Sequence, residues 1–309
     1  MVQGDAALNG MTAEPCGRGH ACTFCEYGPT CRLDKKRHDA ALPRRRLQHV
    51  RATIMVLSNK GGVGKSTVAA NIAAALAMSG LAVGLADVDI HGPNAVKMTG
   101  AQGGRVRVRD SGIEPYSLAL GRNLPFIKLA SLAFFLEDDA SPVVWRDAYK
   151  FDYIQHLFGS FDWGELDYLV LDMPPGTGNE LITSCDVLEG YPIFALLVTT
   201  PESIALLDTI KSVRFCEERK ISVLGVIKNM TGMTCPHCEH VVDIYPDHVA
   251  ESMLAKFPGL EVLAQLPLSA ELARSCDQGE IIAATKPEAD VSAVFHRVAG
   301  AIRERARLW

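Results

Sequence analysis

The stretch Lys60-Gly61-Gly62-Val63-Gly64-Lys65-Ser66-Thr67 stands between a short apolar run, residues 52–58, and an Ala- and Leu-rich segment, residues 66–79, that is followed by Gly80. The apolar run predicts a buried strand, and the segment after the turn predicts a helix. Glycines between them let the backbone curl so that successive N–H groups point at phosphate oxygens, and the helix N-terminus adds partial positive charge. This order of strand, turn and helix predicts a phosphate-binding loop.

Four residues in or beside this loop have particular expected properties. Lys65 is expected to bring a full positive charge to the β- and γ-phosphates, and Ser66 to offer its hydroxyl to Mg²⁺. Asn59 takes the place of the usual first glycine, where an asparagine tolerates left-handed backbone. Lys60 is an additional lysine at the second loop position, where such loops generally carry no required lysine.

Apolar runs and helical patterns alternate along the rest of the chain. Strands are expected at residues 81–87, 125–130, 168–172, 193–199, 221–228 and 262–265, and helices at residues 147–158, 178–188, 203–220 and near 291–302. Short apolar strands alternating with helices indicate a parallel sheet covered on both faces. We therefore expect an α/β fold with one domain at residues 51–309, preceded by a cysteine-rich arm and basic linker at residues 1–50.

Two acidic segments end predicted strands. Asp87-Val88-Asp89 ends the second strand, and Asp172-Met173-Pro174-Pro175-Gly176-Thr177-Gly178 ends the strand at residues 168–172. Carboxylates at strand ends beside a phosphate loop can hold Mg²⁺ through water or position an attacking water. We expect Asp89 and Asp172 to act in this way; capping of a turn is the structural alternative for each.

Six of the nine cysteines gather in two places. The odd number and the length of the chain argue against a disulfide framework, whereas bunched thiols favour a metal site. Cys185, Cys216 and Cys276 are scattered, and we expect each to be small apolar filler or an incidental thiol.

The segment Cys235-Pro236-His237-Cys238 supplies two thiolates, too few for a four-coordinate metal site built by one chain from this motif alone. The spacing suits two chains that each give two thiolates to one shared iron–sulfur cluster. Two alternatives stay open: His237 and His240 could add nitrogen ligands for zinc, or the two thiols could form a redox pair.

The arm carries four more thiols, followed by a basic stretch. Its four cysteines could hold a 4Fe–4S cluster or a tetrahedral zinc, between which their spacing does not choose; they are Cys16, Cys22, Cys25 and Cys31. His20 is expected to be a bystander. For the basic residues 32–51 we favour a solvated linker over a nucleic-acid contact, because the chain is acidic overall and no aromatic residues are interleaved with these charges.

Composition and the lack of long apolar stretches restrict the expected cellular location of the protein. The chain has 309 residues, a net charge of −5 and 48% hydrophobic residues, which suits a globular fold. No stretch approaches the roughly 18–20 uninterrupted apolar residues of a membrane helix, and the first ten residues lack a secretory pattern. We therefore expect a cytoplasmic protein that has no contact with membranes.

These segments occur in the order seen in Mrp/ApbC-type iron–sulfur cluster carrier ATPases, which the chain resembles over about residues 51–282. The loop with its extra Lys60 resembles the deviant Walker A group of ParA, MinD and nitrogenase iron-protein ATPases. The arm resembles the N-terminal cluster site of the eukaryotic-type cytosolic scaffold branch, although Cys16 lies only six positions before Cys22, where that branch usually has a longer gap.

The resemblance implies a P-loop ATPase that forms a homodimer and binds ATP and Mg²⁺. It implies a labile 4Fe–4S cluster held between the Cys235 and Cys238 pairs of two chains and passed to apo iron–sulfur proteins. Lys60 would reach the nucleotide of the partner subunit, and Asn229 would read the adenine base. The phosphates would be wrapped by Lys60, Gly61, Gly62, Val63, Gly64, Lys65, Ser66 and Thr67, with Lys60, Lys65 and Asp89 serving hydrolysis.

Two other functions compete with this interpretation. One is a ParA/MinD-like positioning ATPase that binds DNA or membrane; against it stand the C-P-x-C motif and the lack of a strongly basic amphipathic helix at the C-terminus. The other is a zinc-stabilised regulatory NTPase that carries no iron, which metal analysis would distinguish.

Overall fold

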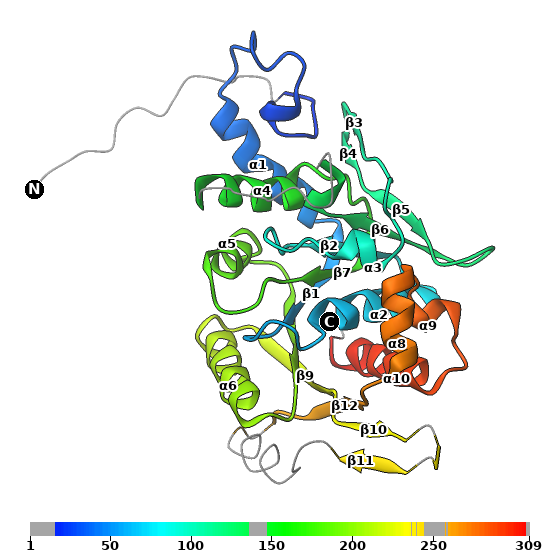
Figure 1. Cartoon of the computed structure of the whole chain (residues 1–309). Helices are drawn as coiled ribbons and strands as arrows, with labels where there is room; N and C mark the ends of the chain where they lie inside the picture. Colours follow the sequence, from blue (N-terminus) through cyan, green and yellow to red (C-terminus); the bar gives the residue numbers. More distant parts are fainter. Residues whose placement is uncertain are drawn as a thin grey trace, which may run out of the picture.

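A central eight-stranded sheet organises the chain (Figure 1). The computed structural model describes residues 16–135, 147–235, 237–238, 240–243, 257 and 259–306. The strands of the sheet are β1 (Val50–Leu57), β2 (Val83–Asp87), β5 (Tyr116–Ala119), β6 (Phe126–Ala130), β7 (Leu166–Asp172), β8 (Ile193–Thr199), β9 (Ser222–Asn229) and β12 (Val262–Leu266). Their order is β12-β9-β8-β1-β7-β2-β6-β5, and neighbouring strands are parallel except for β5 with β6.

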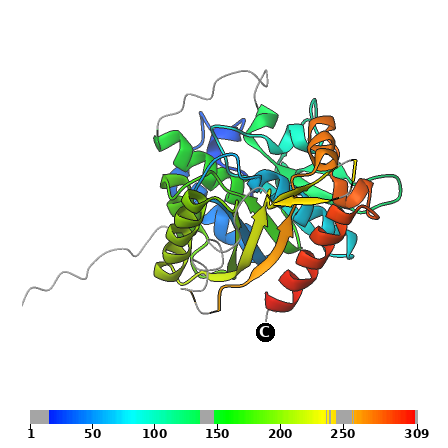
Figure 2. The same ribbon diagram turned by 60° about the horizontal axis from the view of Figure 1, so that its bottom comes forward.

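Helices cover both faces of this sheet, as Figure 1 shows. The helices are α1 (Lys35–Leu47), α2 (Lys65–Met78), α3 (Ala95–Met98), α4 (Asp147–Gly159), α5 (Asn179–Val187), α6 (Ser203–Glu218), α8 (Ala270–Gln278), α9 (Ile282–Thr285) and α10 (Asp290–Arg305), with 3₁₀ turns η1 (Cys22–Phe24) and η2 (Leu132–Phe135). In Figure 2, α10 runs beside β12, with which it is in contact.

The central strand β1 shows why helices must pack on both faces of the sheet. Ile54 and Val56 belong to the core that includes residues of α2 and α10, whereas Met55 and Leu57 belong to the core that includes residues of α4, α5 and α6. Successive side chains of a strand point to opposite faces, so a continuous apolar run requires apolar layers on both sides. The predicted α/β fold, a mostly parallel sheet between helices, is confirmed.

The basic segment that was expected to be a solvated linker contains a helix, and for residues 35–47 that prediction was wrong. Asp34 caps α1, because its side chain accepts a hydrogen bond from the N–H of Arg37 at 3.1 Å. Leu42 and Leu47 are buried, and α1 packs against α4. The apolar positions of α1 are too few to give a helical period, so only the contact with α4 reveals the buried face.

Two small antiparallel ribbons were not expected. They pair β3 (Arg107–Arg109) with β4 (Gly112–Glu114), and β10 (Gly232–Thr234) with β11 (Val241–Asp243). Strands of three residues contain no apolar run from which to predict them. The β10–β11 ribbon lies beyond β12 at the edge of the molecule in Figure 1.

Among the described helices, none has the length and apolar character needed to span a membrane.

Candidate nucleotide and thiol sites

The glycine-rich loop joins β1 to α2 at the carboxyl edge of the sheet. Gly64 is the N-cap of α2, and its φ of +86° and the φ of +80° at Gly62 place both in left-handed backbone. Asn59, expected to tolerate that conformation, does not adopt it. The curl of the loop is therefore produced by glycines alone, which adopt positive φ at no steric cost.

Two strand-end carboxylates lie next to the loop. Asp87 of β2 and Asp172 of β7 are register partners in neighbouring parallel strands, and both side chains are buried. The Nζ atom of Lys65 forms an ion pair with Asp172 and donates to the Ser66 hydroxyl at 3.3 Å. The fold thus gathers the lysine, the hydroxyl and the carboxylate that the sequence assigned to a phosphate and Mg²⁺ site.

Asp87 is the first carboxylate of the acidic segment that was expected to end the second strand, and it is fully buried. Its oxygens accept hydrogen bonds from the N–H groups of Asp89 and Ala95 and from the Ser131 hydroxyl, each at 3.1 Å. Burial and the neighbouring charge of Asp172 raise the pKa of Asp87 well above its ordinary value. A cation beside Asp87 would stabilise its charged form.

Asp89 lies one step further along the same loop. It is half-buried and accepts a hydrogen bond from the Gly92 N–H at 3.2 Å. Burial raises its pKa, an effect that the charge of Lys65 opposes. The side chain is more accessible than Asp87, and this position suits contact with water at the phosphate loop.

Asn229 connects the phosphate loop with the end of β9. Its Nδ2 atom donates to the backbone oxygen of Val63 at 2.9 Å, and the side chain is buried. A second link is the hydrogen bond from the Gly176 N–H to the Ser58 oxygen at 2.9 Å. The loop is therefore held by groups at the ends of β7 and β9. The adenine contact implied for Asn229 stays a prediction.

Lys60 forms an ion pair with a residue outside the loop. Its side chain is 42% exposed, and its Nζ atom lies 2.6 Å from Oε2 of Glu202, the residue that precedes α6. Sequence reasoning missed Glu202, although its place just after β8, a neighbour of β1, was a usable signal. This ion pair connects the side chain of Lys60 with the N-terminal end of α6.

Gly64 permits a specific test of this arrangement. A Cβ atom at Gly64 would lie 2.2 Å from Nδ2 of Asn229, in backbone that L-residues avoid. We expect Gly64→Ala to lower the free energy of unfolding by about 2 kcal/mol. At Gly61 the backbone is not left-handed and a Cβ atom meets nothing within 4 Å, so Gly61→Ala is the matched control and should change stability little. Denaturant unfolding of both variants checks this, and equal losses would contradict it.

The thiols of the C-P-x-C segment lie at the tip of the β10–β11 hairpin. The Cys235 N–H donates to the His240 oxygen at 2.9 Å and closes the turn. Cys235 is half-buried, and Cys238 is exposed. Hydrogen bonds from the N–H groups of His237 and Cys238 and from the Cys238 thiol lower the pKa of Cys235. The tip therefore presents two neighbouring thiols, of which Cys238 is the more exposed.

The four thiols of the arm surround one small cavity. Each is partly buried; they are Cys16, Cys22, Cys25 and Cys31. Burial, followed by the charge of Asp39, raises the pKa of Cys22 to about 12. His20 and His38 also line the cavity. The side chain of His38 was not singled out from the sequence, because nothing in the motif links it to the cysteines.

The chain resembles known proteins over most of its length. A family model described as ParA, NUBPL iron-transfer P-loop NTPase, matches residues 49–303. The chain is 39% identical to the iron-sulfur cluster carrier protein of Methanocaldococcus jannaschii, covering 84% of this chain and 87% of the relative. It is 36% identical to the cytosolic Fe-S cluster assembly factor NUBP1 homolog of Caenorhabditis elegans, covering 97% of both, and 40% identical to human NUBP2, covering 78% and 88%.

Solved structures give the same result for the fold. A nucleotide-binding protein from Archaeoglobus fulgidus in complex with ADP superposes with a TM-score of 0.68 and 31% identity, covering 82% of this chain and 95% of that one. MinD from Pyrococcus horikoshii with Mg-ADP gives 0.59 and 21%, covering 83% and 97%, a likeness of fold alone. Since the family model spans most of the chain and relatives above 30% identity cover most of it, the chain belongs to the NUBPL iron-transfer P-loop NTPases of the ParA type.

Proposed function

We propose that this chain is an ATP-dependent iron–sulfur cluster carrier, which binds a labile 4Fe–4S cluster through Cys235 and Cys238 and passes it to apoproteins. One observation carries the proposal. Strand β9 ends at Asn229, which holds the phosphate loop, and the chain continues directly into the hairpin with the thiols. A change at the loop would therefore have a short path to Cys235, which follows Asn229 by six positions. The names of the curated relatives support the same cargo.

ATP hydrolysis is the proposed source of the change. Lys65 and the loop N–H groups would bind the phosphates, and Ser66 with Asp172 and Asp89 would hold Mg²⁺, directly or through water. The donor set fits this ion, because it consists of oxygen atoms and lies beside the phosphate loop. Loss of the γ-phosphate would release the loops that follow β2 and β7, as happens in switch loops generally.

A homodimer completes the cluster site. Two thiolates per chain satisfy half of a 4Fe–4S cluster, so two exposed hairpin tips supply the four that it needs. The partly exposed Lys60 would reach the nucleotide of the partner subunit, as the family resemblance implies. The cytosolic relatives favour a cytoplasmic location, and the arm would add a second metal site, either iron–sulfur or zinc.

Anaerobic reconstitution tests the proposal. Protein supplied with iron and sulfide should become brown and, with ATP and Mg²⁺, should be a dimer by light scattering. The cluster should move to apo-ferredoxin faster with ATP than without it, as followed by the holo-ferredoxin spectrum. A protein that stays colourless and monomeric under these conditions would contradict the carrier function. So would a rate of cluster transfer that is the same with and without ATP.

A further inference from the structure

The 3₁₀ turn η1 of the arm packs the ring of Phe24 against the ATPase domain. The ring stacks on Phe135 of η2 with the centroids 5.9 Å apart, and it meets the imidazole of His156 on α4 edge to face at 5.1 Å. Phe24 is partly buried by these contacts. Because it lies between Cys22 and Cys25 in the sequence, the residue that anchors the arm also joins two of its thiols.

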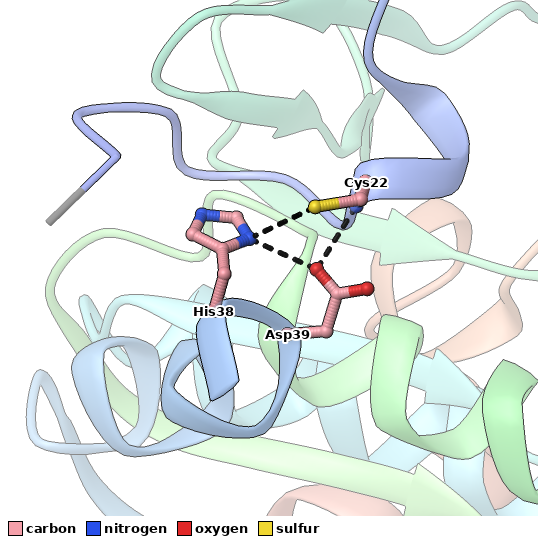
Figure 3. Close-up of side chains that lie close together, drawn as sticks. All are labelled: Cys22, His38 and Asp39. Carbon is pink, nitrogen blue, oxygen red and sulfur yellow. Dashed lines mark hydrogen bonds and ion pairs between the residues drawn. The ribbon is translucent and has the colours of Figure 1, made fainter. Parts of the chain in front are cut away.

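Hydrogen bonds fix the rest of the arm on α1 and at the end of α4. The Cys22 N–H donates to Oδ1 of Asp39 on α1 at 2.9 Å, and Figure 3 shows this carboxylate and the ring of His38 beside the thiol. The Ala21 N–H donates to the hydroxyl of Ser160, the residue after α4, at 3.0 Å. The position of the anchoring ring therefore depends on how the whole arm is attached.

The packing around this ring continues to the acidic loop that follows β2. Phe24 packs against an apolar cluster that includes Tyr153 of α4. Val88 and Ile90 belong to the same cluster, and they flank Asp89, a carboxylate proposed for Mg²⁺. Side chains in close-packed interiors cannot shift independently of their neighbours. The arm and the acidic loop therefore share one packed layer.

Two hydroxyl groups connect this layer with Asp87, the first residue of the acidic segment. The buried Tyr153 donates to the backbone oxygen of Asp87 at 3.0 Å, and Ser131, just before η2, donates to its carboxylate at 3.1 Å. Asp87 in turn accepts the N–H of Asp89 at 3.1 Å. The segments that contact Phe24, which are α4 and η2 with the residue before it, therefore also hold the acidic loop.

We propose that the arm regulates the nucleotide site: packing of Phe24 against α4 and η2 sets the position of Asp87 and the loop that follows it, and thereby the affinity for ATP with Mg²⁺. Phe24 and Tyr153 are positioning residues, since both act through Asp87 rather than on the nucleotide itself. Because Phe24 lies between Cys22 and Cys25, a change at the thiols of the arm acts on the nucleotide site by this route. The inference rests on ATP binding by the proposed carrier and names a regulator of that site.

Thermodynamic linkage requires this coupling to act in both directions. If packing of the arm strengthens the binding of ATP with Mg²⁺ by some factor, ATP with Mg²⁺ stabilises the packed arm by the same factor. Coupling between two protein sites commonly changes affinity by about 5- to 150-fold. We expect about tenfold here, toward the lower end of that range, because a single hydroxyl joins Tyr153 to the backbone of Asp87.

The first test is a double-mutant cycle in the full chain, prepared anaerobically. Titration with a fluorescent ATP analogue gives the affinity with saturating Mg²⁺ and with EDTA. Phe24→Ala and Tyr153→Phe should each weaken binding with Mg²⁺ about tenfold. Binding in EDTA should be unchanged, because the loop acts through the ion that its carboxylates hold. Since both substitutions break the same connection, the double variant should bind about as weakly as either single variant.

Three further variants are the controls. Tyr27 is another aromatic residue of the arm, but its ring lies 4.7 Å from the guanidinium of Arg18, so Tyr27→Ala should bind ATP as the parent does. Tyr191 donates its hydroxyl to the backbone oxygen of Arg44 at 3.3 Å, so Tyr191→Phe should also have no effect. Phe24→Tyr keeps the anchoring ring and should restore the parent's affinity. Single variants that all bind ATP as the parent does, or a double variant whose loss is the product of the two single losses, would overturn the proposal.

Hydrogen exchange measures the coupling in the opposite direction. The N–H groups of Phe24, Cys25 and Gly28 donate to backbone oxygens within the arm, so their exchange reports opening of the arm. ATP with Mg²⁺ should slow this exchange about tenfold in the parent, and much less in Tyr153→Phe. A parent that binds ATP while exchange in the arm stays the same would contradict this inference alone. A parent that binds no ATP would contradict the proposed function and remove the inference with it.

Discussion

Lys65→Ala should abolish ATP binding and lower the hydrolysis rate at least about 1,000-fold. The Nζ atom of Lys65 is a buried cation beside the phosphate loop, where it forms an ion pair with Asp172 and contacts the Ser66 hydroxyl. Charge in such a water-poor site acts strongly on phosphate oxygens. Binding of a fluorescent ATP analogue and release of phosphate measure the two effects.

In the Lys65→Ala variant, a loss of ATP binding must be distinguished from a loss of folding stability. Removal of Lys65 leaves Asp172 and Asp87 as two buried carboxylates without their cation, and breaking a buried ion pair costs about 3–5 kcal/mol. Lys65→Ala combined with Asp172→Asn removes one of these charges and should regain much of the lost stability, while ATP binding stays lost. Thermal unfolding measures the regained stability, and binding of a fluorescent ATP analogue measures the loss of nucleotide binding.

An exposed lysine provides the control for charge. Lys211 on α6 pairs with Asp208 at 2.9 Å on the surface, so Lys211→Ala should bind and hydrolyse ATP as the parent does. If Lys65→Ala hydrolysed ATP at the parent's rate, the assignment of the phosphate site would be wrong.

The main features of the fold and the nucleotide site could be predicted because they depend on local sequence. Continuous apolar runs located seven of the eight strands of the central sheet to within two residues, β1 and β7 among them, whereas β5 was not predicted. Parallel strands end at one edge, and this brings Asp172 to the phosphate loop without any knowledge of long-range contacts. The glycine pattern likewise placed the turn before α2, where positive φ occurs at Gly62 and Gly64.

The features that were missed depend on contacts between distant segments. Helix α1 buries Leu42 and Leu47 because α4 lies against it, and the sequence of α1 alone has too few apolar residues to show this. Glu202 meets Lys60 across 142 positions of sequence, and His38 meets Cys22 across 16. No spacing rule links such pairs, so only the tertiary structure reveals them.

The largest loss of iron–sulfur cluster binding should come from Cys235→Ser combined with Cys238→Ser. Hydrogen bonds to Cys235 lower its pKa and favour the thiolate that iron requires, and Cys238 is exposed for a shared site. Serine keeps the size of cysteine but removes the soft sulfur ligand. We expect the variant to lose about four iron atoms per dimer after anaerobic reconstitution, and cluster transfer to apo-ferredoxin should fall to background.

Two comparisons decide what such a loss would mean. ATP binding should be retained in the cysteine variant, because the hairpin tip makes no contact with Lys65 or Asp172 among the hydrogen bonds and ion pairs of the described residues. His237→Ala combined with His240→Ala leaves both thiols in the same turn and should keep the brown absorbance and the transfer rate, whereas a zinc site with nitrogen ligands would lose its metal. Unchanged iron content and transfer in the cysteine variant would remove the cluster from the hairpin, since no other pair of thiols lies at its tip.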